Sequence, residues 1–528
     1  MTATDAALDS PRAGRRRRPR PLLTARDQRG RERLLDALVV AAPALLGLAL
    51  CLYQITTRSL WLDESATVAI ASQHGAAFGS AVAHDGGNML AYYALLHVVI
   101  TLFGSGALAI RLPAALAAAA TVAVVGALGL RLANRRAALF AGLLTAVSLT
   151  MVYWGQDARG YTPMIALVAG SFLALLAVLE GRGGFKAWLA YVVLTTAAIY
   201  VGLEAVLVLP AQLVALIWFR DRWRPVVLGM LVTLACCIPL AVLAANRGST
   251  QLFWVPSPSF RVLVQVVQAA TSSGLQPSFY TSTTTALLVL TLVLLLAGAI
   301  RTWETARAGG VVWRPALMLA WLLVPAAVAS IESAVGQSIF QPRYLLISLP
   351  AVSLLVGWTL TDRRLPRWLS LGVMAALIAL RALQLAPAYG VSPENWRGAT
   401  SYVLAHARSG DCAAFYPLDN RQAFRYYLKD FAKAPRPILP ATPWREVRPF
   451  VEDYASLSTA QLAQVPRECQ RVWLLASHEG RVGGPPISSG NYTRFNRLTE
   501  GLSRQYPVVS RTTTFGQAGV VTVTLYSR

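Results

Sequence analysis

About eleven apolar runs fill residues 36–385, and this pattern constrains the fold more than any other feature of the chain. An α-helix rises about 1.5 Å per residue, so about 20 apolar residues cross the hydrocarbon core of a bilayer. The chain is 55% hydrophobic and 14% charged, whereas soluble proteins carry about 25% charged residues. We therefore predict a polytopic α-helical membrane protein with about eleven transmembrane helices. The runs are 36–54, 112–130, 138–154, 162–180, 187–202, 205–219, 226–245, 284–300, 315–332, 344–361 and 368–385.

The formal net charge of +23 reflects basic residues that cluster before residue 36 and in short loops between the apolar runs. Arginine-rich segments of membrane proteins stay in the cytoplasm, so this distribution does not call for a nucleic-acid partner. We predict that residues 1–35 form a disordered cytoplasmic tail, which anionic membrane lipids attract. The expected location is the cytoplasmic membrane of a bacterium.

The short basic loops, such as 131–136, follow alternate apolar runs. Asp63 follows the first crossing and lies outside the cytoplasm. All of the basic loops are then cytoplasmic only if an odd number of crossings separates Asp63 from the loop 131–136. Residues 89–104 are short for a crossing and lead into a Gly-Ser-Gly sequence, so we predict a juxtamembrane or re-entrant helix there. The transmembrane part is then 36–385, and its first loop, 59–111, lies outside the cytoplasm.

Residues 386–528 are polar and mixed in composition, which predicts a soluble extracytoplasmic α/β domain of ordinary size. The predicted strands are 412–416, 471–476 and 520–526, and the predicted helices are 399–407 and 421–428.

Two of the five cysteines, Cys412 and Cys469, lie at the starts of two predicted strands. Neighbouring strands are about 5 Å apart, within reach of a disulfide, and oxidation is permitted outside the cytoplasm. Two buried, unpaired thiols are the alternative. Cys51, Cys236 and Cys237 lie in apolar runs and are expected to be small core residues.

Asp63 and Glu64 lie just beyond the first apolar run. Adjacent carboxylates at a membrane interface are costly unless their charge or basicity is used. Asp63 is the candidate general base. The alternative is that both residues cap a helix over 63–73. Three roles are open for Glu64: catalysis by orienting the acceptor, metal binding, or capping.

Four segments on the predicted outer face form a set in a fixed order. They are Leu60-Trp61-Leu62-Asp63-Glu64, His84-Asp85-Gly86-Gly87-Asn88 with Tyr92-Tyr93, Tyr153-Trp154-Gly155-Gln156-Asp157-Ala158-Arg159-Gly160-Tyr161, and Gln341-Pro342-Arg343-Tyr344-Leu345-Leu346. This set resembles the GT-C superfamily of membrane glycosyltransferases, in the branch of protein O-mannosyltransferases and the lipid A aminoarabinose transferase, over roughly residues 36–360. One departure is Gly86-Gly87-Asn88, where many relatives read His-Pro-Pro-(Leu)-Tyr-Tyr.

The resemblance implies that the leaving group is a polyprenyl phosphate, whose negative charge needs fixed cations near the outer leaflet. Arg159 and Arg343 are at outer ends of predicted spans and are the candidate phosphate-binding residues, because the guanidinium fork matches phosphate oxygens. Snorkelling to lipid headgroups is the alternative. Asp157 is expected to pair with Arg159 or to hold the sugar.

The remaining candidates are substrate or metal ligands. His84 and Asp85 are expected to bind substrate, or a divalent cation together with Asp63 or Glu64; whether a cation is needed is open. The tyrosines Tyr93 and Tyr161, with Tyr92, are expected to line the cavity or to be ordinary interfacial aromatics. Glu204 is a further candidate for contact with the acceptor, at an outer span end.

The leading hypothesis is an inverting glycosyltransferase with a polyprenyl-monophosphate sugar as donor and a glycan, lipid or protein as acceptor. Inversion follows from a single displacement, since nothing in the sequence indicates a covalent nucleophile. Mannose is the first guess for the sugar, and an arabinose-type pentose is the second. The alternative is a transporter or flippase of lipid-linked sugars. Transporters place ionisable groups near the bilayer midplane between repeated halves, whereas the candidate residues here gather at one face.

Overall fold

The computed structural model describes residues 25–248, 252, 255, 257–447, 449, 469–482, 486–517 and 521–528. The chain divides into two units, residues 1–38 and 39–528. In the first unit, the described residues are helical and belong to α1, Ala25–Leu52. Helix α1 therefore begins inside the segment expected to be a disordered tail, and residues 1–24 of that tail lie outside the described residues.

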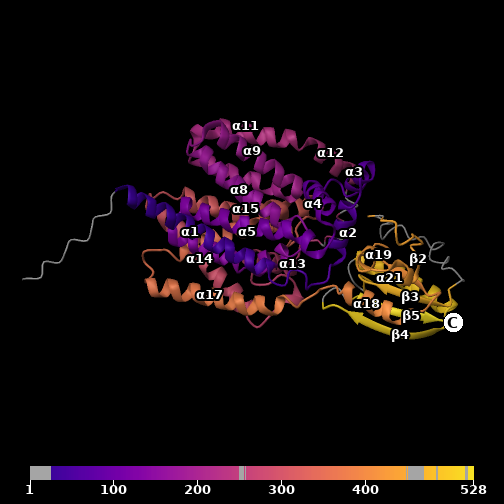
Figure 1. Ribbon diagram of the computed structural model, residues 1–528. Helices are drawn as coiled ribbons and strands as arrows, with labels where there is room; N and C mark the ends of the chain where they lie inside the picture. Colours follow the sequence, from indigo (N-terminus) through magenta and orange to yellow (C-terminus); the bar gives the residue numbers. More distant parts are fainter. Residues whose placement is uncertain are drawn as a thin grey trace, which may run out of the picture. The chain divides into compact units, whose positions relative to one another are not determined.

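Helices fill the chain up to residue 388 (Figure 1). After α1 they are α2 (Leu62–Ala71), α3 (Gly75–His84), α4 (Leu90–Phe103), α5 (Ala107–Leu132), α6 (Arg135–Ala146), α7 (Leu149–Gly155), α8 (Tyr161–Leu179), α9 (Gly184–Val201), α10 (Leu209–Leu213), α11 (Trp223–Cys236), α12 (Ile238–Arg247), α13 (Phe260–Thr271), α14 (Thr284–Arg307), α15 (Trp313–Val335), α16 (Leu349–Thr359) and α17 (Arg367–Ala388). Short 3-10 helices are η1 (Leu203–Val208), η2 (Val214–Ile217), η3 (Arg220–Arg222), η5 (Pro277–Phe279) and η6 (Leu345–Ser348).

Within the described residues, seven helices are long and apolar enough to cross a membrane, and two bent helix pairs raise the number to nine. The seven are α1, α5, α8, α9, α14, α15 and α17, and the pairs are α6–α7 and α11–α12. The other two predicted runs coincide with shorter apolar helices, Leu203–Ile217 and Leu345–Thr359. The polytopic helical fold is thus confirmed, while eleven crossings remain a prediction.

The two bends have local causes. Helices α6 and α7 meet at 54°, where the Ser148 hydroxyl accepts a hydrogen bond from the Met151 N–H and caps α7. Helices α11 and α12 meet at 49°, with a proline in the first turn of α12, and proline cannot donate a backbone hydrogen bond. Arg381 of α17 donates to the carbonyls of Leu144 and Thr271, so backbone acceptors near the first bend are satisfied inside the protein.

The predicted C-terminal α/β region is confirmed as a five-stranded mixed sheet of order β2-β1-β3-β5-β4. The strands are β1 (Cys412–Tyr416), β2 (Arg436–Leu439), β3 (Arg471–Ala476), β4 (Val508–Phe515) and β5 (Val521–Ser527). Strand β1 pairs parallel with β2 and β3, and β5 pairs antiparallel with β3 and β4. The helices here are α18 (Trp396–His406), α19 (Asn420–Tyr426), η7 (Phe431–Lys433) and α21 (Pro486–Gln505).

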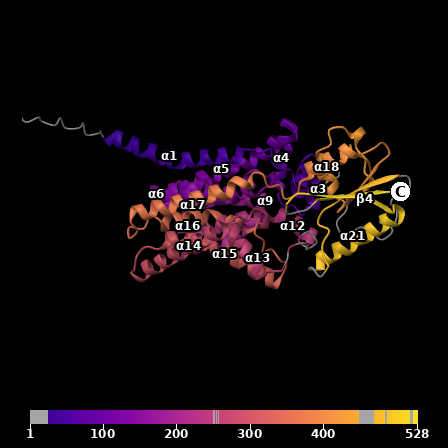
Figure 2. The same cartoon turned by 90° about the horizontal axis from the view of Figure 1, so that it is seen from below.

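Alternation of side chains along β1 and β3 gives the sheet two buried faces. Ala414 and Leu474 pack with Leu498 and Leu502 of α21 on one face. Their neighbours in the strands pack with α18 and α19 on the other face. Figure 2 shows α18 and α21 on opposite sides of the sheet. A sheet covered on both faces matches the fully buried pattern of β1.

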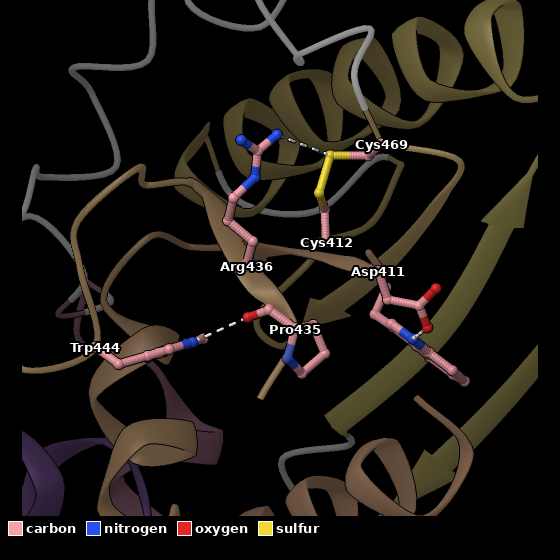
Figure 3. The surroundings of a disulfide bond; sticks show 7 residues. Asp411, Cys412, Pro435, Arg436, Trp444 and Cys469 are labelled. Atoms are coloured by element: carbon pink, nitrogen blue, oxygen red, sulfur yellow. Dashed lines mark hydrogen bonds between the residues drawn. A yellow bond between two sulfur atoms is a disulfide. The ribbon is translucent and has the colours of Figure 1, made fainter. Parts of the chain in front are cut away.

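Cys412 and Cys469 form a disulfide, with their Cα atoms 5.9 Å apart (Figure 3). The Arg436 guanidinium lies 3.7 Å from the Cys469 sulfur, and nearby the Trp444 indole donates to the carbonyl of Pro435. The prediction of a bond between these cysteines is confirmed, and the alternative of two free thiols is wrong. Cys51 and Cys237 are buried as expected, while Cys236 is exposed.

We call residues 386–528 the sheet region. Replacing both Cys412 and Cys469 by serine should destabilise this region by about 4 kcal/mol, because the bond closes a loop of 57 residues in the unfolded chain. Thermal unfolding of the full-length protein in detergent measures this change. Cys236→Ser, at an exposed free thiol, serves as the control and should leave the unfolding temperature unchanged. Equal unfolding temperatures for the two variants would contradict the prediction.

Candidate active site

Helix α2 places the two adjacent carboxylates in its first turn. Trp61 precedes the helix with extended backbone and makes no side-chain cap. Asp63 and Glu64 therefore do not cap the helix as the alternative interpretation requires, although the first turn is where the helix dipole favours negative charge. The two side chains make different contacts.

Asp63 meets both candidate phosphate-binding arginines. Arg343, in the turn before η6, donates from Nη1 to Asp63 Oδ2 at 2.9 Å. Arg159, between α7 and α8, has its Nη2 3.8 Å from the same oxygen and donates from Nη1 to Thr67 Oγ1 at 2.9 Å. The side chain of Asp63 is 30% exposed, against 20% for Arg343 and 11% for Arg159. A carboxylate that solvent still reaches is thus held by two largely buried cations, which argues against simple snorkelling.

The charge on Asp63 follows from these contacts. Burial alone would raise the pKa of its carboxyl, but the charges of Arg159 and Arg343 and the hydrogen bond from Arg343 outweigh that effect. The pKa of Asp63 is therefore lower than its usual value, and the residue is a carboxylate at neutral pH.

Glu64 is buried against Arg111, a residue of α5 that the sequence reasoning missed. Arg111 donates from Nε and Nη2 to the two carboxylate oxygens of Glu64, each at 2.7 Å. Each side chain is only 1% exposed. The Ala158 N–H also donates to Glu64 Oε1, at 2.8 Å. Glu64 thus ties α2 to α5 and to the loop that carries Arg159, and a role in the chemistry itself remains a prediction.

Asp157 lies in the same loop and is held by Trp61, whose indole N–H donates to Asp157 Oδ2 at 3.0 Å. The ion pair of Arg159 is with Asp63 rather than with Asp157. Burial and the nearby Glu64 carboxylate raise the pKa of Asp157. The structure therefore shows Asp157 as a contact between α2 and the 156–160 loop, and sugar binding by Asp157 remains a prediction.

The remaining sequence candidates lie around this centre without forming a metal cluster. The Tyr93 hydroxyl donates to Asp85 Oδ2 at 2.8 Å, and His84 is exposed at the end of α3. Buried Tyr161 has its ring centroid 5.8 Å from the Arg159 guanidinium carbon. In the described part of the chain, no group of three or more His, Cys, Asp or Glu side chains is placed to hold a metal ion, so Glu64, His84 and Asp85 are not brought together as one.

The glycine pair that departs from the resembled motif has a conformational reason. Gly86 and Gly87 have φ of 64° and 74°, values that proline cannot adopt. A Cβ on Gly87 would lie 2.8 Å from Cδ1 of Leu240. This turn between α3 and α4 therefore excludes proline at both positions and favours glycine.

Glu204, at the start of the 3-10 helix η1, is a second carboxylate near the arginines. Its Oε1 is buried and has no hydrogen-bond partner among the residues that the structure describes. Burial raises the pKa of Glu204 to about 7, against the opposing charges of Arg343 and Arg159. Contact of this residue with an acceptor remains a prediction.

Comparison with known proteins agrees with this arrangement of helices. The crystal structure of ArnT from Cupriavidus metallidurans bound to undecaprenyl phosphate is similar, with a TM-score of 0.55, 16% identity, and coverage of 94% of this chain and 98% of that chain. The chain therefore shares the fold of ArnT. The archaeal oligosaccharyltransferase AglB from Archaeoglobus fulgidus, in complex with an inhibitory peptide and a dolichol-phosphate, matches with a TM-score of 0.51, 11% identity, and coverage of 93% and 74%.

A family model described as dolichyl-phosphate-mannose-protein mannosyltransferase matches residues 89–244 of the chain. The match includes Asp157 and Arg159 and leaves out Asp63 and Arg343. The three-dimensional structure brings Asp63 into contact with Arg159 and Arg343. A comparison with curated proteins gave no match. The fold and the apolar helices identify a multi-pass membrane protein.

Arg111→Ala should destabilise the protein by about 3–5 kcal/mol, because it leaves the Glu64 carboxylate buried without its cation. The control is Arg131→Ala on the same helix, where the arginine is 35% exposed and 3.8 Å from Glu180. A pair this exposed contributes less than about 1 kcal/mol. Thermal unfolding in detergent compares the two variants, and equal losses would contradict a special role for the Arg111–Glu64 pair.

Proposed function

We propose that the protein is an inverting glycosyltransferase that moves a sugar from a polyprenyl monophosphate to an acceptor at the outer face of the cytoplasmic membrane. The observation that carries this proposal is the contact of one carboxylate, Asp63, with two arginines from separate segments, Arg159 and Arg343. The GT-C fold supports it, as do the lipid phosphates bound to ArnT and AglB. A base beside fixed cations is what transfer from a lipid phosphate requires.

The reaction is a single displacement. The acceptor hydroxyl gives its proton to Asp63 while its oxygen forms the new bond to the anomeric carbon. The bond from that carbon to the phosphate oxygen breaks, and its electron pair leaves with the polyprenyl phosphate. Arg159 and Arg343 stabilise the charge that develops on this leaving group. One displacement inverts the anomeric carbon.

The same contacts couple donor binding to the strength of the base. Without donor, the arginines lower the pKa of Asp63, which makes the carboxylate a weak base. A phosphodiester that binds the arginines would offset their positive charge, and the pKa of Asp63 would rise toward the range that suits proton abstraction. The base is then strongest when the donor is in place.

For the sugar we propose mannose first, in line with the description of the matching family model, and an arabinose-type pentose second. The acceptor is a glycan, lipid or protein. The first loop with Asp63 and the sheet region are proposed to lie outside the cytoplasm, because that topology keeps the basic loops in the cytoplasm.

Asp63→Asn should lower turnover by about two to four orders of magnitude, because it keeps the shape of the side chain and removes its basicity. The assay incubates purified protein with a panel of polyprenyl-phosphate sugars and measures release of polyprenyl phosphate. Asp221→Asn, at an aspartate that is 74% exposed in η3, is the matched control and should retain full activity. Near-normal turnover of the Asp63 variant would transfer the base role to another residue.

Arg343→Ala and Arg159→Ala should each raise the donor KM about 10- to 150-fold, since each removes a charge-assisted contact of about 1.5–3 kcal/mol. The matched control is Arg364→Ala, where the arginine is 75% exposed and pairs with Glu304. Donor titrations at fixed acceptor measure the effect. Wild-type donor kinetics in both variants would show that the two arginines do not bind the donor phosphate.

A further inference from the structure

The sheet region holds the backbone segment that leads into Asp63. The Leu60 N–H donates to the Tyr427 hydroxyl at 2.7 Å, and the Leu62 N–H donates to Glu394 Oε2 at 3.0 Å. The guanidinium of Arg397 donates to the carbonyls of Thr56 and Thr57. The segment before the candidate base is thus hydrogen-bonded by residues that follow the membrane helices in the sequence.

Glu394 is the buried centre of this contact, with only 3% of the residue exposed. Its Oε2 also accepts a hydrogen bond from the Trp396 indole at 2.8 Å. Its Oε1 lies 3.6 Å from Nε2 of His478. One carboxylate therefore contacts both the first turn of α2 and an imidazole of the sheet region.

His478 lies two residues after the end of β3, at the carboxyl edge of the parallel strands β1 and β3. Ligand sites of parallel sheets lie at this edge. The residue has φ of 54°, which non-glycine residues adopt at a cost and often at functional positions. Its Nδ1 is 3.0 Å from the Ser477 hydroxyl. Because 44% of its side chain is exposed, a substrate can reach the imidazole.

His478 also approaches Asp63, because Glu394, which it contacts, accepts the N–H of Leu62, the residue directly before Asp63. Two kinds of group thus approach Asp63. Arg159 and Arg343 of the helical part can bind an anion. The Glu394 carboxylate beside His478 repels an anion. A neutral hydroxyl fits there, because imidazole can both donate and accept hydrogen bonds.

We propose that His478, positioned by Glu394, binds the acceptor hydroxyl beside Asp63, so that the sheet region supplies the acceptor subsite of the transfer site. The inference rests on the proposed function. It assigns the acceptor to His478 and the donor to Arg159 and Arg343. The competing interpretation is that Glu394 only holds the start of α2 and that His478 is a surface histidine.

The test uses the full-length protein and two measurements. The first is binding of undecaprenyl phosphate, which probes the donor side alone. The second is release of polyprenyl phosphate from the active donor, with and without a detergent extract of the native membranes as the source of acceptor. His478→Ala should bind undecaprenyl phosphate like wild type and lose about 10- to 100-fold of the acceptor-stimulated rate, with the loss in the acceptor KM. His478→Gln, which keeps a donor and an acceptor in the side chain, should recover part of it.

The matched control is His406→Ala, at an exposed histidine of the same region whose ring contacts the carbonyl of Tyr402. It should behave like wild type in both measurements. Wild-type acceptor kinetics for His478→Ala would overturn the inference and leave the proposed function intact. Equal losses of lipid-phosphate binding and transfer would also overturn it, since they indicate a structural role. A wild-type protein that uses no lipid-linked sugar would overturn the proposed function and this inference together.

Discussion

The buried pair of Glu64 and Arg111 is the contact on which the site geometry depends. Arg111 comes from a membrane helix, Glu64 from the short helix that carries Asp63, and the same carboxylate accepts the Ala158 N–H. Three segments that are distant in sequence are therefore fixed by one ion pair. Arg159 follows Ala158 directly, so the pair also determines how far Arg159 lies from Asp63. Removing one partner of such a pair costs more than the net contribution of the pair, because the other charge stays buried.

The adjacent carboxylates consequently have separate tasks. Asp63 is partly exposed and contacts cations whose charge a substrate could neutralise, whereas Glu64 is sealed and contacts a cation that no substrate reaches. The sequence reasoning assigned the base to Asp63 and left three roles open for Glu64. Burial separates them, and burial depends on what the neighbouring helices present, which a single sequence does not show.

Apolar length was enough to predict the helices and the sheet region, and motif order placed Asp63, Arg159 and Arg343 on the predicted outer face. The physical reason is that spans and strands follow from local periodicity, and the motif residues could be compared with a known superfamily. The pairing of Arg159 with Asp63 was not predicted, because Asp157 was the expected partner. The sequence reasoning missed Arg111, which lies within an apolar helix. An isolated arginine in such a helix needs a partner, so this residue was a usable signal. The sequence reasoning also missed Glu394 and His478, because their contacts depend on how the sheet region packs against residues 56–62. No local sequence pattern predicts this packing.

The number of crossings illustrates a different limit. Hydropathy detects a run of apolar residues, but Pro239 and the capping hydroxyl of Ser148 break two of these runs into bent pairs. Breaks of this kind free backbone groups that lipid cannot satisfy, so they persist only where side chains such as Arg381 supply donors from inside the protein. The broken run of α6 and α7 is buried against its neighbours, whereas α11 and α12 expose residues such as Leu234 and Ile238 beside their bend. The breaks explain why hydropathy and helix length give different counts for the same chain.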